Sequence, residues 1–162
     1  MIKFRKIYIG NIIKCIRLKV LPEQKNFVGS NFDSLIQAFG LNRRMIGKGS
    51  KATPYAIYAD DIMVGFIMYG YFIKNVKYNK HGEAYYYFWR FMIDKNHQGK
   101  GYAKKALVLL INEIKQKPHG EATFCYVSYE PTNTVIRTWY QSMGFTETGE
   151  LIEGELIARL KI

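Results

Sequence analysis

A glycine-rich turn at residues 98–101, Gln-Gly-Lys-Gly, joins a strand-like stretch ending at Asp94 to a long amphipathic segment. Gly99 and Gly101 can adopt backbone angles that other residues avoid, and they let the chain approach a ligand closely. The first N–H groups of the helix that follows lack partners within the helix and point toward one spot, which favours an anion. The spacing fits neither the three-glycine dinucleotide loop nor the Walker loop. The turn therefore predicts a different phosphate-containing ligand.

The segment after Gly101 has the periodicity of a helix. Apolar residues recur at three- and four-residue steps between Ala103 and Ile114, and Pro118 and Gly120 end the pattern. Lysines that could contact a pyrophosphate lie in or just after the turn: Lys100, Lys104 and Lys105. The alternative is that they form an ordinary solvated helix face.

A second group of polar residues follows Glu130 and Pro131. Pro131 prevents a helix from starting earlier. We expect a helix over about 133–143, with Thr132 or Asn133 as its cap and Gly144 just past its end. Asn133 and Tyr140 are seven residues apart, about two turns or roughly 10 Å on one helix face. An amide and a phenol would then share one groove. Alternatively, Tyr140 is a core residue whose hydroxyl bonds to a backbone carbonyl.

Together these two stretches resemble the GNAT superfamily of N-acetyltransferases. Its pattern Gln/Arg-x-x-Gly-x-Gly/Ala is met by Gln98, Gly101 and Ala103, and a later Asn, Tyr and Gly-Phe by Asn133, Tyr140 and residues 144–145. The resemblance covers roughly residues 55 to 160. The stretches 64–71, 90–94 and 148–151 are similar to the bacterial spermine/spermidine acetyltransferase-type branch.

The coarse pattern predicts a strand near 3–8 and helical segments near 9–20 and 31–39, then strands near 54–59, 62–73 and 84–94, with a turn at residues 60–61. The helix from 101 precedes a strand near 122–128, and the helix from 133 precedes strands near 145–150 and 155–161. The stretches 47–53 and 74–83 read as loops. We expect an α/β (α+β) fold, as in the GNAT superfamily: a mixed, mostly antiparallel seven-stranded sheet with helices on both faces.

The resemblance implies that the fourth and fifth strands, 84–94 and 122–128, separate and leave a slot for acetyl-CoA. Its arm would pair with the backbone of Phe91 and Ile93, and Asn133 would hold it from the opposite side. A backbone N–H of Met92 or Ile93 would stabilise the oxyanion, and Tyr140 would protonate the departing thiolate. The implied cosubstrate-binding residues are Phe91, Met92, Ile93, Gln98, Gly99, Lys100, Gly101, Tyr102, Ala103, Lys104 and Asn133.

The acceptor would be a primary amine of a small molecule, and the branch resemblance favours a polyamine. No residue declares itself as the general base; Glu83 and Glu130 are candidates by position, a water chain is an alternative, and each glutamate could be an ordinary exposed carboxylate. Trp89 and the preceding tyrosines could form a cation–π wall, although alternating burial on a strand explains them too. Glu150 belongs to an acidic cluster, with Glu147, Glu153 and Glu155, that could attract an amine or be a solvated turn. The net charge of +11 suits an anionic cosubstrate but would repel a polycation at long range.

Composition limits the remaining choices. A chain of 162 residues with 48% apolar residues suits one domain over 1–162. The lysine and arginine residues near the amino terminus argue against a signal peptide, so we expect a cytoplasmic protein, without a membrane or nucleic-acid partner and with a homodimer left open. Cys15, Cys125 and the histidines His81, His97 and His119 form no ligand pattern, so neither a metal nor a disulfide is expected. Rival readings are a transferase for an aminoglycoside, amino acid or protein N-terminus, a non-catalytic acetyl-CoA-binding domain, and a nucleic-acid-binding module.

Overall fold

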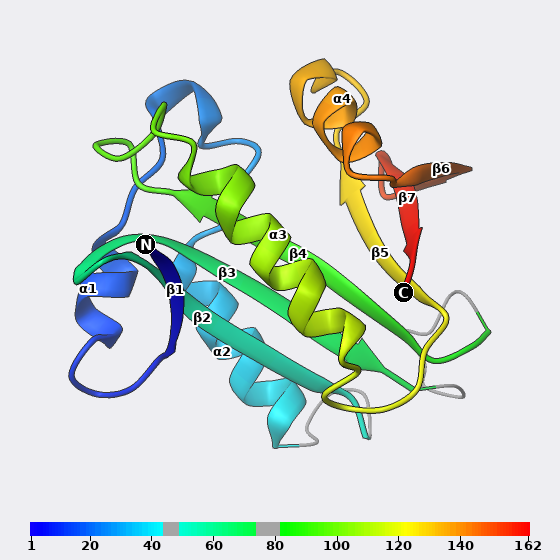
Figure 1. The fold of residues 1–162 in the computed structure, drawn as a ribbon, viewed down its shortest axis with the longest axis horizontal. Coiled ribbons are helices and arrows are strands. Elements are labelled where there is room, and N and C mark those ends of the chain that lie inside the picture. The colour runs from blue at the N-terminus through cyan, green and yellow to red at the C-terminus, as the bar shows by residue number, and fades with distance from the viewer. Residues whose placement is uncertain (44–48, 74–81) are drawn as a thin grey trace.

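The structure, a computed structural model, describes residues 1–43, 49–73 and 82–162 (Figure 1). The elements are β1 (Ile2–Lys6), α1 (Ile12–Arg17), the 3₁₀ helix η1 (Pro22–Gln24), α2 (Asn31–Asn42), β2 (Lys51–Ala59), β3 (Ile62–Phe72), β4 (Tyr85–Ile93), α3 (Tyr102–Lys115), β5 (Phe124–Tyr129), α4 (Thr134–Ser142), β6 (Thr146–Ile152) and β7 (Glu155–Lys161). His81 and most of the loop expected over 74–83 lie outside the described residues, as do residues 47 and 48.

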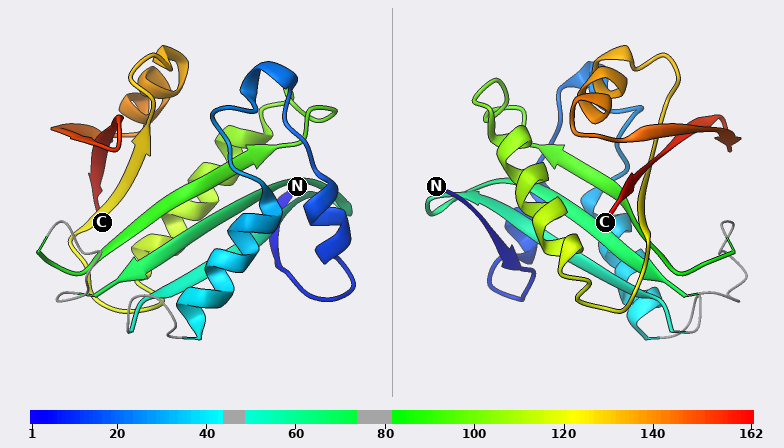
Figure 2. Two further views of the ribbon diagram at one scale, coloured as in Figure 1. Left: turned by 180° about the vertical axis from the view of Figure 1, so that it is seen from behind. Right: turned by 45° about the vertical axis from the view of Figure 1, so that its right-hand side comes forward.

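The seven strands form one sheet in the order β1-β2-β3-β4-β5-β7-β6. All neighbouring pairs are antiparallel except β4 and β5, which run parallel. This confirms the expected mixed, mostly antiparallel sheet. Helix α3 crosses one face, and α1 and α2 lie on the opposite face (Figures 1 and 2).

Each face of the sheet has its own apolar core. On the α3 face, Leu107, Leu110 and Ile114 are fully buried, because the stripe predicted from their spacing faces the sheet. On the other face, Cys15 of α1 and Ala38 of α2 pack in a second cluster. The two helix layers therefore hold the central strands from both sides.

Two expectations about element ends were wrong. The helix expected over 9–20 is limited to Ile12–Arg17, because Leu18 is extended and Lys19 pairs instead with the end of β4: its N–H lies 2.8 Å from Asp94 Oδ2, and its carbonyl accepts from Lys95 N. The loop expected over 47–53 ends early, since β2 begins at Lys51. There the Asn42 side chain hydrogen-bonds both backbone groups of Ala52 at 2.8 and 2.9 Å.

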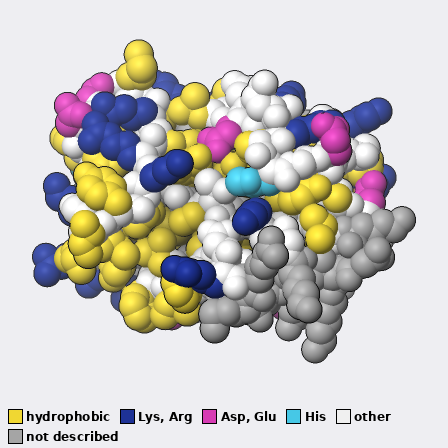
Figure 3. Space-filling model, turned by 90° about the horizontal axis from the view of Figure 1, so that it is seen from below, with side chains coloured by type: hydrophobic (Ala, Val, Ile, Leu, Met, Phe, Trp, Pro, Cys, Tyr) yellow, Lys and Arg dark blue, Asp and Glu magenta, His cyan; other side chains and the backbone are white. Residues whose placement is uncertain are grey.

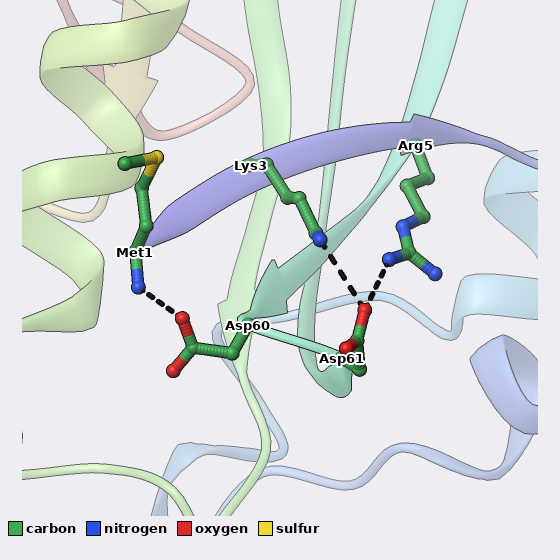
Figure 4. A network of polar contacts seen from close by, with 5 residues as sticks. All are labelled: Met1, Lys3, Arg5, Asp60 and Asp61. Atoms are coloured by element: carbon green, nitrogen blue, oxygen red, sulfur yellow. Dashed lines mark hydrogen bonds and ion pairs between the residues drawn. The ribbon is translucent and has the colours of Figure 1, made fainter.

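The tight turn at Asp60 and Asp61 connects β2 and β3 as expected, with Asp60 at φ 54°. Asp61 accepts from Lys3 at 3.3 Å and from Arg5 at 2.6 Å, and Asp60 contacts the amino group of Met1 (Figure 4). The two carboxylates thus hold β1 against the end of the β2–β3 hairpin.

Strand β4 contains a β-bulge at Trp89. Arg90 pairs with Met68 and Phe88 pairs with Tyr69, so Trp89 is the extra residue on β4. As a result the consecutive side chains of Trp89 and Arg90 both reach α2, where Trp89 Nε1 lies 3.2 Å from Gln37 Oε1 and Arg90 Nε lies 3.0 Å from Ser34 Oγ. A regular strand would place them on opposite faces.

The outer surface of α1 and α2 carries exposed apolar side chains, Ile13, Phe32, Ile36 and Phe39. Viewed from below, hydrophobic side chains gather on this part of the surface with lysines and arginines among them (Figure 3). Within the described part of the chain, no helix is both long and apolar enough to cross a membrane.

Candidate functional site

A cavity of about 710 Å³ lies where β4 and β5 separate. The two strands pair only at Tyr86 with Cys125 and at Tyr87 with Tyr126, and beyond these pairs β5 continues beside β7. The cavity walls come from β4, β5, α4, the start of α3, the segment between α1 and α2, and the β6–β7 turn. The slot expected between strands four and five therefore corresponds to a real cavity.

The backbone of β4 supplies polar groups to this gap. Asp94 donates its N–H to Val64 of β3 at 2.8 Å, and backbone groups alternate sides along a strand. Met92, two residues earlier, therefore faces β3, whereas Phe91 and Ile93 face the gap. The Ile93 carbonyl accepts from Gln98 Nε2 at 2.9 Å. Of the two oxyanion donors considered from the sequence, Met92 and Ile93, only Ile93 has its N–H on the gap side, and Phe91 joins it there.

The glycine loop, residues 98–101, lies at the end of this gap. Gly99 and Gly101 have φ angles of 76° and 72°, where a side chain would be strained. A Cβ at either position would meet no atom of the described chain within 4 Å, so the space above the loop is open. Gly101 caps α3, and the free N–H groups of the first helical turn follow directly. The loop thus has the geometry of an anion site.

Tyr140 projects from α4 into the same cavity and is 6% exposed. Its ring lies 5.8 Å from that of Phe88 and 6.0 Å from that of Trp139, measured between centroids. Its hydroxyl has no hydrogen bond among the described residues, which differs from the alternative of a carbonyl-bonded core tyrosine. Burial, then the neighbouring Tyr87, raise the pKa of Tyr140, so its hydroxyl is protonated at neutral pH.

Asn133, one of the two caps that the sequence allowed, is the N-cap of α4, and its side chain accepts from Ile136 N at 3.2 Å. It also lines the cavity, seven residues before Tyr140 in the chain. A helix of nine residues therefore presents the amide at its start and the phenol near its end to one space.

A chain of hydroxyl and carboxylate groups on the opposite wall was missed by the sequence reasoning. Tyr87 of β4 lies with its hydroxyl 2.6 Å from Ser128 Oγ of β5, and Ser128 donates to Glu155 Oε2 of β7. All three line the cavity. No local motif joins residues 87, 128 and 155; only the strand order brings them together.

The site residues predicted from the sequence divide into those that line the cavity and those that do not. Those that line the cavity are Trp89, Phe91, Met92, Ile93, Gln98, Gly99, Gly101, Tyr102, Ala103, Glu130, Asn133 and Tyr140. Lys100, Lys104 and Glu150 are exposed and do not line it, and Glu83 lies at a separate shallow pocket beside Lys117. Among the described residues no cluster of three or more His, Cys, Asp or Glu side chains could hold a metal.

The fold and the site point to one class of protein. Residues 50–147 match the family described as Acetyltransferase (GNAT) domain, and the chain belongs to this family. Over 98 residues, 60% of the chain, it is 37% identical to a probable spermine N(1)-acetyltransferase of Bacillus subtilis subsp. natto (strain BEST195). It is 36% identical over the same length to a spermine/spermidine N(1)-acetyltransferase of Bacillus subtilis (strain 168). The match spans 62% of each relative, less than two thirds of their length.

Solved structures resemble the chain over nearly its whole length. An aminoglycoside acetyltransferase, AAC(6')-Ib, in complex with coenzyme A has a TM-score of 0.73 at 12% identity, covering 99% of this chain and 95% of its own. The PaiA N-acetyltransferase of Thermoplasma acidophilum in complex with coenzyme A has a TM-score of 0.66 at 16% identity, covering 100% of this chain and 99% of its own. These likenesses establish the fold, and the resemblance recognised in the sequence is confirmed.

Proposed function

We propose that this protein is an N-acetyltransferase that moves an acetyl group from acetyl-CoA to a primary amine of a small molecule, a polyamine such as spermidine or spermine. The observation that carries the proposal is the cavity itself, which brings an open glycine loop, gap-facing β4 amides and a protonated tyrosine into one space. The names of the Bacillus relatives support the reaction class and the acceptor.

The residues present fit acetyl-CoA. The glycine loop and the first turn of α3 would hold the pyrophosphate, because both glycines leave open space and the helix N-terminus favours negative charge. The gap-facing backbone of Phe91 and Ile93 would pair with the extended amide arm as an added strand does. Asn133 would contact the arm from α4. When bound, acetyl-CoA supplies the thioester whose acetyl group is transferred.

Two groups of this chain have positions suited to the chemistry. A gap-facing N–H of Phe91 or Ile93 would donate to the oxygen that gains negative charge as the amine attacks. Tyr140 would give its phenolic proton to the departing sulfur, since burial keeps that hydroxyl protonated. Its hydroxyl has no competing acceptor among the described side chains.

Local charge favours a cationic acceptor in spite of the net charge of the chain. The described cavity wall carries three carboxylates, Glu130, Glu153 and Glu155, and one guanidinium, Arg90. Arg90 is held toward α2 by its bonds to Ser34 Oγ and to the Trp89 carbonyl, each 3.0 Å long. The ammonium groups of a polyamine would therefore lie toward the β6–β7 side of the cavity and away from Arg90.

Release of free thiol from acetyl-CoA in the presence of an amine panel tests the proposal. Turnover with polyamines is the expected result, and faster turnover with aminoglycosides, amino acids or peptide amino termini would replace the acceptor. Tight binding of acetyl-CoA without turnover of any amine would instead indicate a non-catalytic binding domain. Binding of nucleic acid without binding of acetyl-CoA would overturn the reaction class.

A further inference from the structure

We propose that Tyr87, Ser128 and Glu155, here called the proton chain, form the path by which the acceptor ammonium loses its proton. This inference rests on the proposed function. An aliphatic ammonium has a pKa of about 10.4, so it must be deprotonated before its nitrogen can attack. The sequence left the group that does this undefined.

The hydrogen bonds of the proton chain have a defined direction. Glu155 offers a carboxylate, so Ser128 uses its single hydroxyl proton to donate to Glu155 Oε2. Ser128 Oγ can then only accept from Tyr87, whose hydroxyl lies 2.6 Å away. Tyr87 therefore directs its own proton away from the incoming substrate. Its oxygen lone pairs remain available to accept an N–H from an ammonium in the cavity.

The position of the proton chain suits the reacting nitrogen. Tyr87 lies at the last paired position of β4 and β5, at the inner end of the gap. The Tyr87 ring stacks on that of Trp89 at 5.7 Å between centroids, with 9° between their planes. This stacked pair gives an ammonium an aromatic wall next to the accepting hydroxyl. Tyr140, on α4 across the cavity, is close enough to Tyr87 and Glu155 for both to influence its ionisation.

Charged and titratable groups from several elements face the proton chain. Glu155 of β7 and Glu153 of the β6–β7 turn oppose the ionisation of Tyr87, whereas Arg90 of β4 favours it. Burial, the largest influence, raises the pKa of Tyr87 and keeps it a neutral relay. The other titratable side chains on the described cavity wall are His97, Tyr102, Tyr129, Glu130 and Tyr140.

The step transfers one proton and leaves every group neutral or singly charged. The nitrogen's N–H bond breaks and its proton bonds to Tyr87 Oη, while the Tyr87 proton moves to Ser128 Oγ and the Ser128 proton moves to Glu155 Oε2. The ammonium becomes a neutral amine with a free lone pair, and the carboxylate becomes a carboxylic acid that returns its proton to water. Glu130 and Glu153 also line the cavity, but neither side chain has a hydrogen bond within the described residues that links it to Tyr87.

Variants that interrupt the proton chain test this role through their pH dependence. Ser128→Ala and Glu155→Gln should lower kcat/KM for a diamine at pH 7 by about 100-fold, the usual range for general acid–base groups. The defect should shrink to about threefold near pH 11, above the ammonium pKa of about 10.4, because the diamine is then largely deprotonated in solution. Ser128→Thr keeps the hydroxyl and should retain most of the activity at pH 7.

Glu153→Gln is the matched control, since it removes the same charge from the same cavity without interrupting the proton chain. It should raise KM for the diamine at pH 7. With a monoamine, which has no second ammonium for Glu153 to contact, its activity ratio to the unmodified protein should stay constant with pH, whereas the defect of the proton-chain variants should still shrink. A constant ratio for Ser128→Ala and Glu155→Gln as well would overturn the proton chain and leave the acetyltransferase intact. Lack of turnover with every amine in the unmodified protein would overturn both the proposed function and this inference.

A binding measurement gives a readout that does not depend on turnover. In protein labelled with ¹³C at the tyrosine Cζ, Tyr87→Phe identifies the Tyr87 signal among the 13 tyrosines. Addition of the diamine without acetyl-CoA should shift this signal, because its oxygen gains a hydrogen bond. An unshifted Tyr87 signal at saturating diamine would exclude it as the acceptor of the ammonium proton.

Discussion

The side-chain amides of Gln98 and Gln24 hydrogen-bond to each other across the mouth of the cavity. Gln98 Nε2 lies 2.8 Å from Gln24 Oε1, and Gln24 Nε2 lies 3.3 Å from Gln98 Oε1. Gln98 also donates to the Ile93 carbonyl, and Gln24 Oε1 accepts from Leu21 N at 3.2 Å. The glycine loop, the end of β4 and the segment between α1 and α2 are thereby connected. Gln98, the first residue of the glycine loop, thus also holds the segment between α1 and α2 in place.

Gly101→Val should abolish measurable acetyl-CoA binding in a folded protein, because a branched side chain would fill the open space above the glycine loop. Calorimetric titration measures this. Gly149→Val is the matched control: Gly149 has a φ of 83° and equally open surroundings among the described residues, but it does not line the cavity. Both variants should lose about 1–2 kcal/mol of stability from backbone strain. Equal affinity in the two variants would remove the loop from the site.

Tyr140→Phe should lower kcat by about 10- to 1000-fold and leave the acetyl-CoA dissociation constant nearly unchanged, since only a proton donor is lost. Single-turnover kinetics separate the chemical step from product release. Tyr71→Phe is the control, because it removes a buried tyrosine hydroxyl that bonds to the Glu121 carbonyl outside the cavity. An unchanged chemical rate in Tyr140→Phe would assign Tyr140 to packing.

A diamine should exceed a monoamine of equal length in kcat/KM, because its second ammonium gains a charge-assisted contact away from the reacting nitrogen. The advantage should decrease as salt rises, since exposed charges are screened over about 8–10 Å near physiological ionic strength. Glu153→Lys should reduce the preference, whereas Glu150→Lys, outside the cavity, should reduce it much less. Equal effects of the two reversals would mean that long-range charge, and not a cavity contact, sets the preference.

Glu147→Gln should lower the melting temperature at pH 7, and the difference from the unmodified protein should shrink as the pH falls below 4.5. Arg137 hydrogen-bonds both Glu147 oxygens at 2.6 and 2.8 Å, and Tyr129 donates at 2.7 Å, which lowers the pKa of Glu147 below its usual 4.5. A depressed folded-state pKa adds stability above pH 4.5, and this contribution disappears as the pH falls through the lowered value. Thermal denaturation followed by circular dichroism across this range measures it. A difference in melting temperature that does not shrink as the pH falls below 4.5 would contradict the pairing.

Much of the fold was predictable because its signals are local. The α3 stripe at residues 106–114, the capped helix after Asn133 and the aspartate turn at residues 60–61 each follow from short-range spacing and turn chemistry. Helix α1 was predicted too long because its end is set by a contact with Asp94, far away in the sequence. Element ends decided by such distant contacts leave no local signal.

The site residues, too, could be predicted where a local motif marks them and could not where only strand pairing brings them together. The glycine loop and the Asn133 and Tyr140 pair occur as continuous motifs, so their residues could be named from the sequence. The proton chain joins three strands, and neither Ser128 nor Tyr87 has a neighbour in the sequence that marks it. Glu155 stood out only as one of several glutamates near the final hairpin, and its bond to Ser128 depends on the pairing of β5 with β7.

The bulge at Trp89 changes which of the alternating β4 side chains face the α3 side of the sheet. Before it, the even-numbered Tyr86 and Phe88 belong to the core on the α3 face; after it, the odd-numbered Phe91 and Ile93 do. Phe88 and Phe91 are three positions apart and would lie on opposite faces of an uninterrupted strand. With one extra residue between them, Phe88 meets Tyr140 edge-on and Phe91 stacks on Trp139 at 6.0 Å. The single inserted residue thus allows both Phe88 and Phe91 to pack against neighbouring residues of α4. In a β4 without the bulge, only one of these two rings could face α4.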